Sequence, residues 1–148
     1  MKGKWIVILL VLVLLVGVLA VLIKFRDKDV DRDSDFCVRF DGELYYLSFD
    51  DLSNIPTIDV NPPGGEEKFT CYSLPTIAES LGIEWSEIKE IYLSSDDGSK
   101  IKIGLEEANN DEALLSLFKE QPLRFRVIFP LDEFRNRWLK NIFIMDLA

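Results

Sequence analysis

The chain has 148 residues, a formal net charge of −9 and no histidine. A chain without histidine cannot use Ser-His-Asp or Cys-His catalysis, histidine metal ligands or a histidine pH switch. From Ser34 onward there are 22 acidic and 11 basic residues. A surface this acidic repels phosphate backbones, which argues against nucleic acid as a partner.

The first feature along the chain is an unbroken apolar run, residues 5–23, with Lys2 and Lys4 before it and Lys24 after it. At about 1.5 Å per residue, a helix of this run spans roughly the 30 Å of a bilayer's hydrocarbon core. The run is longer than the apolar core of a signal peptide, and no small-x-small cleavage site follows it. The pattern predicts a retained transmembrane anchor at 1–24 that contacts the lipid bilayer through residues 5–23, with Trp5, Leu12, Gly17 and Ile23 as its representative residues.

Cations on both flanks of this run bear on the orientation of the anchor. Counting lysine and arginine alone slightly favours a cytoplasmic domain. A very short basic tail followed at once by the apolar run is, by contrast, typical of a signal-anchor. We therefore expect a single-pass membrane protein with a cytoplasmic N-terminus and an extracytoplasmic soluble domain.

Residues 25–35 are rich in aspartate, which alternates with other residues from Asp27 to Asp35. Calcium loops also place oxygen ligands at every second position, but they need glycine at the sixth position and glutamate at the twelfth. Counting from Asp27, these positions hold Arg32 and Val38. The segment is therefore predicted to be a charged, solvated linker, and no metal site is expected.

The remaining residues, 36–148, alternate short strand-like runs with turn signals, which predicts one β-rich α+β domain. Asp41-Gly42 and the segment 96–99 are typical of hairpin turns, and Ser73 and Gly82 have the residue types that begin and end a helix. The cations around Trp138 predict a solvated turn. The predicted strands are 36–40, 44–49, 57–60, 90–94, 100–104, 124–129 and 141–147; the predicted helical segments are 50–55 and 73–82; and 113–118 is ambiguous between strand and helix.

Five segments of this domain carry motifs in a recognisable order: 69–83, 91–98, 113–116, 121–130 and 138–144. The first is similar to the pattern aromatic-x-Gly-Val-Pro-Leu-x-x-Leu-Leu-x-x-x-Gly-Val, and the last to Trp-Val-Lys-x-Ile-x-x-Ile. With the opening hairpin included, residues 36–147 resemble the oxidoreductase molybdopterin-binding domain family, whose fold is that of sulfite oxidase. The resemblance implies a truncated, sulfite-oxidase-like domain behind a membrane anchor.

One segment departs from the family pattern. In cofactor-bearing members a cysteine thiolate ligates molybdenum in the interval that corresponds to 61–67, which here is short, acidic and without cysteine. We therefore expect no molybdopterin and no catalytic residue. The remaining candidates for a cofactor or ligand cleft are Cys71, which falls on a glycine of the family pattern, and the strand cations Arg124 and Arg126. A Cys37–Cys71 disulfide and two free thiols stay open as alternatives.

Three hypotheses for function follow. The first is a non-catalytic binding or assembly module that meets a membrane or redox partner protein at the membrane surface. The second is an oxidoreductase component that uses Cys71 or the cofactor of a second subunit. The third is a receptor that holds a small ligand in the vacated cofactor cleft beside residues 61–71.

Overall fold

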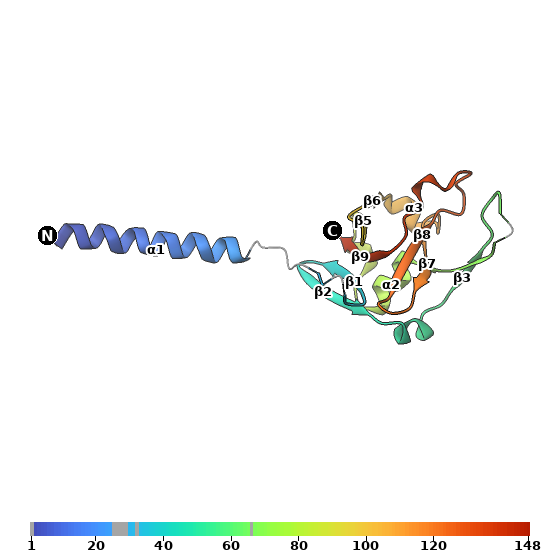
Figure 1. The fold of residues 1–148 in the computed structure, drawn as a ribbon, viewed down its shortest axis with the longest axis horizontal. Coiled ribbons are helices and arrows are strands. Elements are labelled where there is room, and N and C mark those ends of the chain that lie inside the picture. The colour runs from blue at the N-terminus through green and yellow to red at the C-terminus, as the bar shows by residue number, and fades with distance from the viewer. Residues whose placement is uncertain (1, 25–29, 32, 66) are drawn as a thin grey trace.

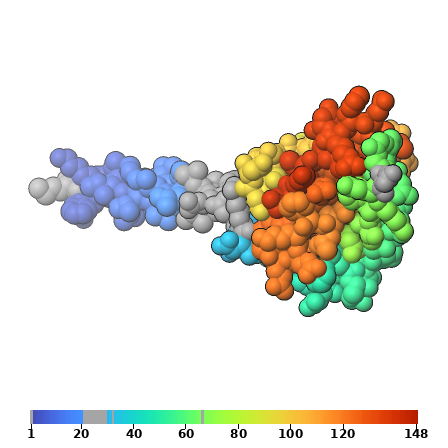
Figure 2. Space-filling view, turned by 45° about the vertical axis from the view of Figure 1, so that its right-hand side comes forward, coloured from blue at the N-terminus to red at the C-terminus, as the bar shows by residue number. Residues whose placement is uncertain are grey.

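The computed structural model describes residues 2–24, 30–31, 33–65 and 67–148. Helix α1 (Lys2–Lys24) is a single rod that projects away from the sheet domain (Figure 1). Its leucine, valine and isoleucine side chains carry no polar group that competes with the backbone, and no proline interrupts the run. Every large apolar side chain from Trp5 to Leu19 is exposed, and the helix stands clear of the domain in the space-filling view (Figure 2).

The domain is built mainly from short strands, as the alternating pattern predicts. Its helices are only one or two turns long, and three of them are 3-10 helices. The strands are β1 (Phe36–Phe40), β2 (Glu43–Leu47), β3 (Ile58–Val60), β4 (Phe69–Ser73), β5 (Ile91–Ser95), β6 (Lys100–Ile103), β7 (Leu114–Lys119), β8 (Arg124–Ile128) and β9 (Ile142–Leu147); the α-helices are α2 (Leu74–Ser80) and α3 (Leu105–Asn109); and the 3-10 helices are Asp50–Asn54, Trp85–Glu87 and Arg135–Arg137.

The nine strands of the described residues form one mixed sheet with two limbs. In the first limb the order is β2-β1-β9-β5-β6, with β1 parallel to β9 and the other pairs antiparallel. In the second limb the order is β8-β7-β4-β3, and all pairs are antiparallel. The limbs meet where Phe125 of β8 pairs with Ile142 of β9. One apolar helix followed by this sheet is an α+β chain, as predicted.

Both predicted hairpins are present. Asp41 and Gly42 have φ angles of 50° and 75°, and this pair of left-handed residues is what a two-residue type I′ turn requires. The turn sets the register of the first hairpin, with Phe40 opposite Glu43. In the second hairpin the Ser95 amide donates to the Ser99 carbonyl at 2.8 Å.

Helix α2 begins and ends at the residues that predict its ends, next to Ser73 and before Gly82. The Ser73 hydroxyl accepts a hydrogen bond from the Thr76 amide at 3.2 Å, and Pro75 lies in the first turn, where its missing donor costs nothing. Gly82, with φ of 81°, follows the last turn. The helix turns its apolar side toward the sheet and buries Leu74, Ile77 and Ala78.

The main core contains buried side chains from both limbs of the sheet. Phe36 of β1 meets Phe125 of β8 edge to face, with ring centroids 4.8 Å apart, although these strands belong to different limbs. Tyr72 of β4 contacts the same Phe125 ring at 6.0 Å. The Phe36–Phe125 contact therefore joins the two limbs where the backbone contributes a single strand pair, and Tyr72 packs on the same ring from within the second limb.

The structure differs from the sequence predictions in four places. Strand β4 and helix α3 were not predicted, and the ambiguous segment 113–118 falls in strand β7. Most of the predicted linker, 25–29 and residue 32, lies outside the described residues. Its last residues are not a solvated spacer, because the Leu123 amide donates to Asp35 Oδ1 at 3.0 Å and fixes this segment to β8.

Candidate functional site

Helix α1 is the first functional candidate, because its composition does not suit water. It is long and apolar enough to cross a membrane: the mean hydropathy over Lys2–Ala20 is 2.7, and none of this window is buried within the structure. Each large apolar side chain left in water forgoes roughly 1.5–3 kcal/mol of burial energy. The predicted anchor residues Trp5, Leu12, Gly17 and Ile23 all lie in this helix.

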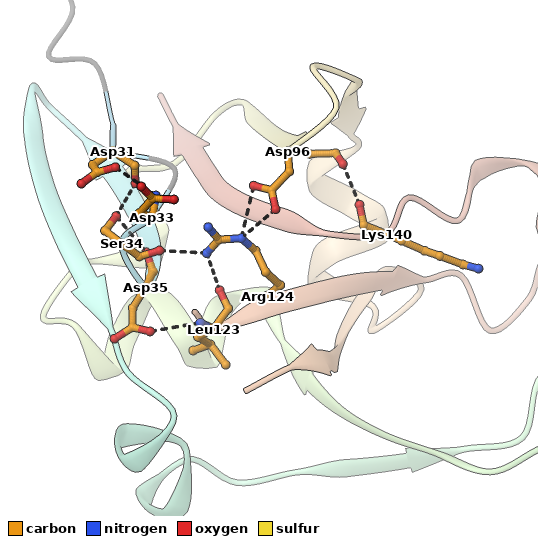
Figure 3. Close-up of polar contacts among 9 residues, drawn as sticks. Asp31, Asp33, Ser34, Asp35, Asp96, Leu123, Arg124 and Lys140 are labelled. Carbon is orange, nitrogen blue, oxygen red and sulfur yellow. Dashed lines mark hydrogen bonds and ion pairs between the residues drawn. The ribbon is translucent and has the colours of Figure 1, made fainter. Parts of the chain in front are cut away.

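Arg124 is the second feature, and it lies where the chain from α1 enters the domain. Its side chain is the largest buried one, with 1% of its surface exposed. Figure 3 shows how protein acceptors surround the guanidinium. Nε donates to both carboxylate oxygens of Asp96, at 3.2 and 3.1 Å, and Nη1 donates to the carbonyls of Ser34 at 2.9 Å and Leu123 at 2.8 Å.

These contacts make Arg124 a clasp that joins three parts of the chain. Asp96 belongs to the β5–β6 turn, Arg124 to β8, and Ser34 to the segment that precedes β1. A buried guanidinium is tolerated when its donors are satisfied, and here a carboxylate accepts from Nε and two carbonyls accept from Nη1. Arg124 therefore fixes the domain to the end of the segment that leads from α1.

Cys71 lies on β4 of the second limb, in a small second core. Its exposed fraction is 0%, and it packs with Leu114 and Ile128. Burial raises the pKa of the Cys71 thiol to about 11, with a smaller contribution from the negative charge of Asp59. At neutral pH the thiol is therefore protonated, and a protonated, enclosed thiol is a poor nucleophile and a poor metal ligand.

The register of the second limb brings two of the candidate residues onto one face. Cys71 of β4 lies opposite Ser116 of β7, and Ser116 lies opposite Arg126 of β8. Arg126 is half-buried; its guanidinium stacks on Phe118 at 5.2 Å, and its Nε is buried without a hydrogen-bond partner. The structure thus aligns Cys71 with Arg126, whereas Arg124 belongs to the clasp.

Side chains from the β8–β9 connection cover this face. Trp138 and Phe69 pack against the second core and meet edge to face at 5.6 Å. Arg135 stacks on Trp138 at 4.5 Å and forms an ion pair with Glu67 at 3.4 Å. The cations near Trp138 therefore lie in an exposed turn, as predicted, and the guanidinium of Arg135 also lies over the rings of Phe69 and Trp138.

The disulfide alternative does not agree with this fold. Both thiols are free and buried. Cys37 lies on β1, between Ile144 of β9 and Tyr46 of β2, whereas Cys71 lies on β4 in the other limb. A disulfide needs its two Cα atoms within about 7 Å of each other, and these strands are separated in the sheet order by β9, β8 and β7.

A molybdenum–pterin group does not fit the residues near Cys71. Molybdenum needs a thiolate, and the Cys71 thiol is protonated and enclosed. A pterin phosphate needs several convergent cations, whereas Arg135 is paired with Glu67 and the guanidinium of Arg126 packs on Phe118. Among the described residues, no group of three or more His, Cys, Asp or Glu side chains gathers in a way that could hold a metal ion.

Comparisons with known proteins add no family to this picture. No protein-family model matches the chain, and no curated protein matches its sequence. The resemblance to the molybdopterin-binding family therefore rests on the five sequence motifs alone and stays a prediction.

The sequence indicates Arg124 as a candidate but does not indicate its partners Asp96 and Ser34. From the sequence, Asp96 is predicted to be a turn residue and Ser34 to be part of a solvated linker. The sequence does contain one indication of such a contact, which is the position of Arg124 in the mostly apolar run 123–129. A cation that is buried in a central strand needs a carboxylate nearby. Sequence alone does not say which of the many acidic residues supplies it.

Proposed function

We propose that this chain is a single-pass membrane protein whose acidic domain is a non-catalytic binding or assembly module outside the cytoplasm. The observation that carries the proposal is the fully exposed apolar surface of α1, attached to a domain whose first residues are held by Arg124. An anchor joined to a firmly seated domain is suited to presenting that domain at a membrane surface.

Two further observations support a role without chemistry. The interval 61–67, which in the resembled family carries the molybdenum ligand, has no cysteine. The one nearby thiol, Cys71, is enclosed by Phe69, Trp138 and the second core. The domain would then keep a family framework without its metal.

Membrane insertion and orientation are tested by fusing the full chain at its C-terminus to alkaline phosphatase, which is active only outside the cytoplasm, or to a fluorescent protein that matures only inside it. We expect carbonate-resistant membrane association and activity of the phosphatase fusion alone. Fluorescence of the second fusion with an inactive phosphatase would overturn the orientation. Release of the chain by carbonate would overturn the anchor.

The non-catalytic role is tested by metal analysis of the purified full chain and of its Cys71→Ser variant. We expect no molybdenum or tungsten in either protein. A content near one atom per chain that is lost in the variant would instead establish the oxidoreductase alternative, with Cys71 as the ligand.

A further inference from the structure

The sheet has three edge strands among the described residues, and two of them are protected against pairing with another chain. Strand β6 carries Lys100 and Lys102, whose charges oppose the approach of a further strand. Strand β3 has only three residues, and its Asp59 is engaged by Lys68 at 3.2 Å. Short strands and lysines are the usual means of blocking a sheet edge.

Strand β2 has neither form of protection. It has five residues, contains no cation and, among the residues that the structure describes, pairs with β1 alone. The β1–β2 turn closes at the pair Phe40–Glu43, so the hydrogen-bonded pairs alternate from there and involve Glu43, Tyr45 and Leu47. The backbone groups of the residues between them, Leu44 and Tyr46, consequently face the open edge.

Hollows lie on either side of Tyr46, whose side chain is half exposed. One, of about 650 Å³, is lined by Tyr46 with Asp33, Asp35 and Pro122 among others. The second, of about 480 Å³, is lined by Tyr46 with Asp51 and Leu81 among others. Figure 1 places β2 at the outer side of the domain, near the point where the chain from α1 enters.

The charge of these hollows points to the chemistry of an occupant. Asp33, Asp35 and Asp51 contribute carboxylates, and neither lining contains a lysine or arginine. In residues 33–60 the one cation is Arg39, which forms an ion pair with Asp146 at 3.3 Å. A second copy of this surface would therefore bring carboxylates against carboxylates, whereas lysine or arginine side chains would complement them.

We propose that the open edge of β2 is a docking site for an extended basic segment of a partner protein. The segment adds as a further strand that pairs with the backbone of Leu44 and Tyr46. Basic side chains of the added strand meet the carboxylates of Asp33 and Asp51, which line the two hollows beside Tyr46. This proposal rests on the binding-module part of the proposed function and names the class of partner.

The test uses the full chain in nanodiscs of zwitterionic lipid, which does not itself attract basic peptides. The probe is a capped octapeptide of alternating lysine and valine, and its controls are the glutamate–valine octapeptide and a lysine–valine octapeptide that is N-methylated at alternate residues. We expect saturable binding of the first peptide alone, with slower amide hydrogen exchange in β2 and unchanged exchange in β6.

Two variants that remove the same number of negative charges test whether Asp33 and Asp51 contribute to peptide binding. The double variant Asp33→Asn/Asp51→Asn should weaken binding about three- to tenfold, because each exposed ion pair contributes up to about 1 kcal/mol. The variant Asp97→Asn/Asp111→Asn removes the same charge from residues that line neither hollow and should bind as the unaltered chain does. Asp35 is kept because its carboxylate joins two distant segments through the Leu123 amide. Asp51, by contrast, accepts from its neighbour Ser48, at 2.8 Å from the amide, and an asparagine oxygen can accept the same bond.

Several outcomes would overturn the proposal. Equal binding of the N-methylated peptide would show attraction without strand pairing, and equal weakening by both double variants would show a general charge effect. Self-association of the chain with protection of β2, in the absence of peptide, would make a second copy the occupant. Failure of the chain to insert into nanodiscs would count against the anchor only, because peptide binding can then be measured on the same chain in detergent.

Discussion

Helix α1 and the sheet domain place the same kinds of side chain in opposite environments. In α1 the leucines, valines and isoleucines from Ile6 to Leu19 are exposed, whereas in the domain Leu74, Ile91 and Val127 are fully buried. A soluble domain gains its stability by removing apolar surface from water, and α1 gains nothing in that way from its own fold. The domain is therefore suited to water, whereas α1 is long and apolar enough to cross the hydrocarbon of a membrane.

The largest expected effect comes from placing charge in the middle of α1. Leu14→Arg with Leu15→Arg should cost about 6 kcal/mol of membrane insertion, since each arginine at a helix centre costs about 3 kcal/mol. We expect the chain to leave the membrane pellet after carbonate extraction, while the domain keeps its near-UV circular dichroism spectrum. The control is Asn110→Arg, which adds a cation to the exposed surface of the domain. If the double variant stays in the pellet, α1 is not the anchor.

The second largest effect is expected from removing an apolar side chain from the core of the domain. Phe125→Ala removes the ring that joins the limbs and should lower the free energy of unfolding by about 3–5 kcal/mol, measured by urea unfolding in mild detergent. Phe134 is the matched control, because it is 72% exposed and Phe134→Ala should change the free energy by less than about 0.5 kcal/mol. Equal effects of the two variants would contradict the core assignment.

A smaller effect is expected at the junction of the two regions. Arg124→Met removes the hydrogen bonds to Ser34 and Leu123 and should cost about 2–3 kcal/mol, less than a fully buried pair would, because Asp96 is partly exposed and can be hydrated. Hydrogen exchange should rise in the segment before β1. Arg126→Met is the control and should cost about 1 kcal/mol or less, since Arg126 makes no comparable clasp. Unchanged exchange near Ser34 would refute the clasp.

The smallest effect concerns the thiols of the domain interior. Burial raises the pKa of both Cys37 and Cys71 from 9.0 to about 11. A pKa raised in the folded state gives stability that is present in full below the unfolded pKa and is lost as the pH rises to the folded pKa. We therefore expect the free energy of unfolding to fall by roughly 1–2 kcal/mol per thiol between pH 9 and 11.

The Cys37→Ala/Cys71→Ala variant isolates this contribution, because tyrosines and lysines also titrate in the same range. The variant should lose less stability than the unaltered chain over that interval. Iodoacetamide at pH 8 should label neither thiol in the folded chain and both after unfolding. Labelling of Cys71 in the folded chain would show that the cover formed by Phe69 and Trp138 opens.

Some elements of the fold can be predicted from short stretches of sequence, because they depend on neighbouring residues. The apolar run of α1, the Asp41-Gly42 turn and the Ser73 and Gly82 punctuation of α2 each depend on neighbouring residues, so their predicted structures agree with those found. Strand β4 and helix α3 escaped prediction because β4 runs directly into α2 without a turn signal and α3 is a five-residue helix with little periodicity.

The contacts between residues that are distant in the sequence could be identified only from the tertiary structure. The order of strands in the sheet brings Arg124 to Asp96 and Ser34, and it separates Cys37 from Cys71. It also allows Arg135 to stack on Trp138. The same order leaves β2 at an open edge between acidic hollows. Strand order is set by the packing of whole faces against one another, and a pattern of neighbouring residues does not contain that information.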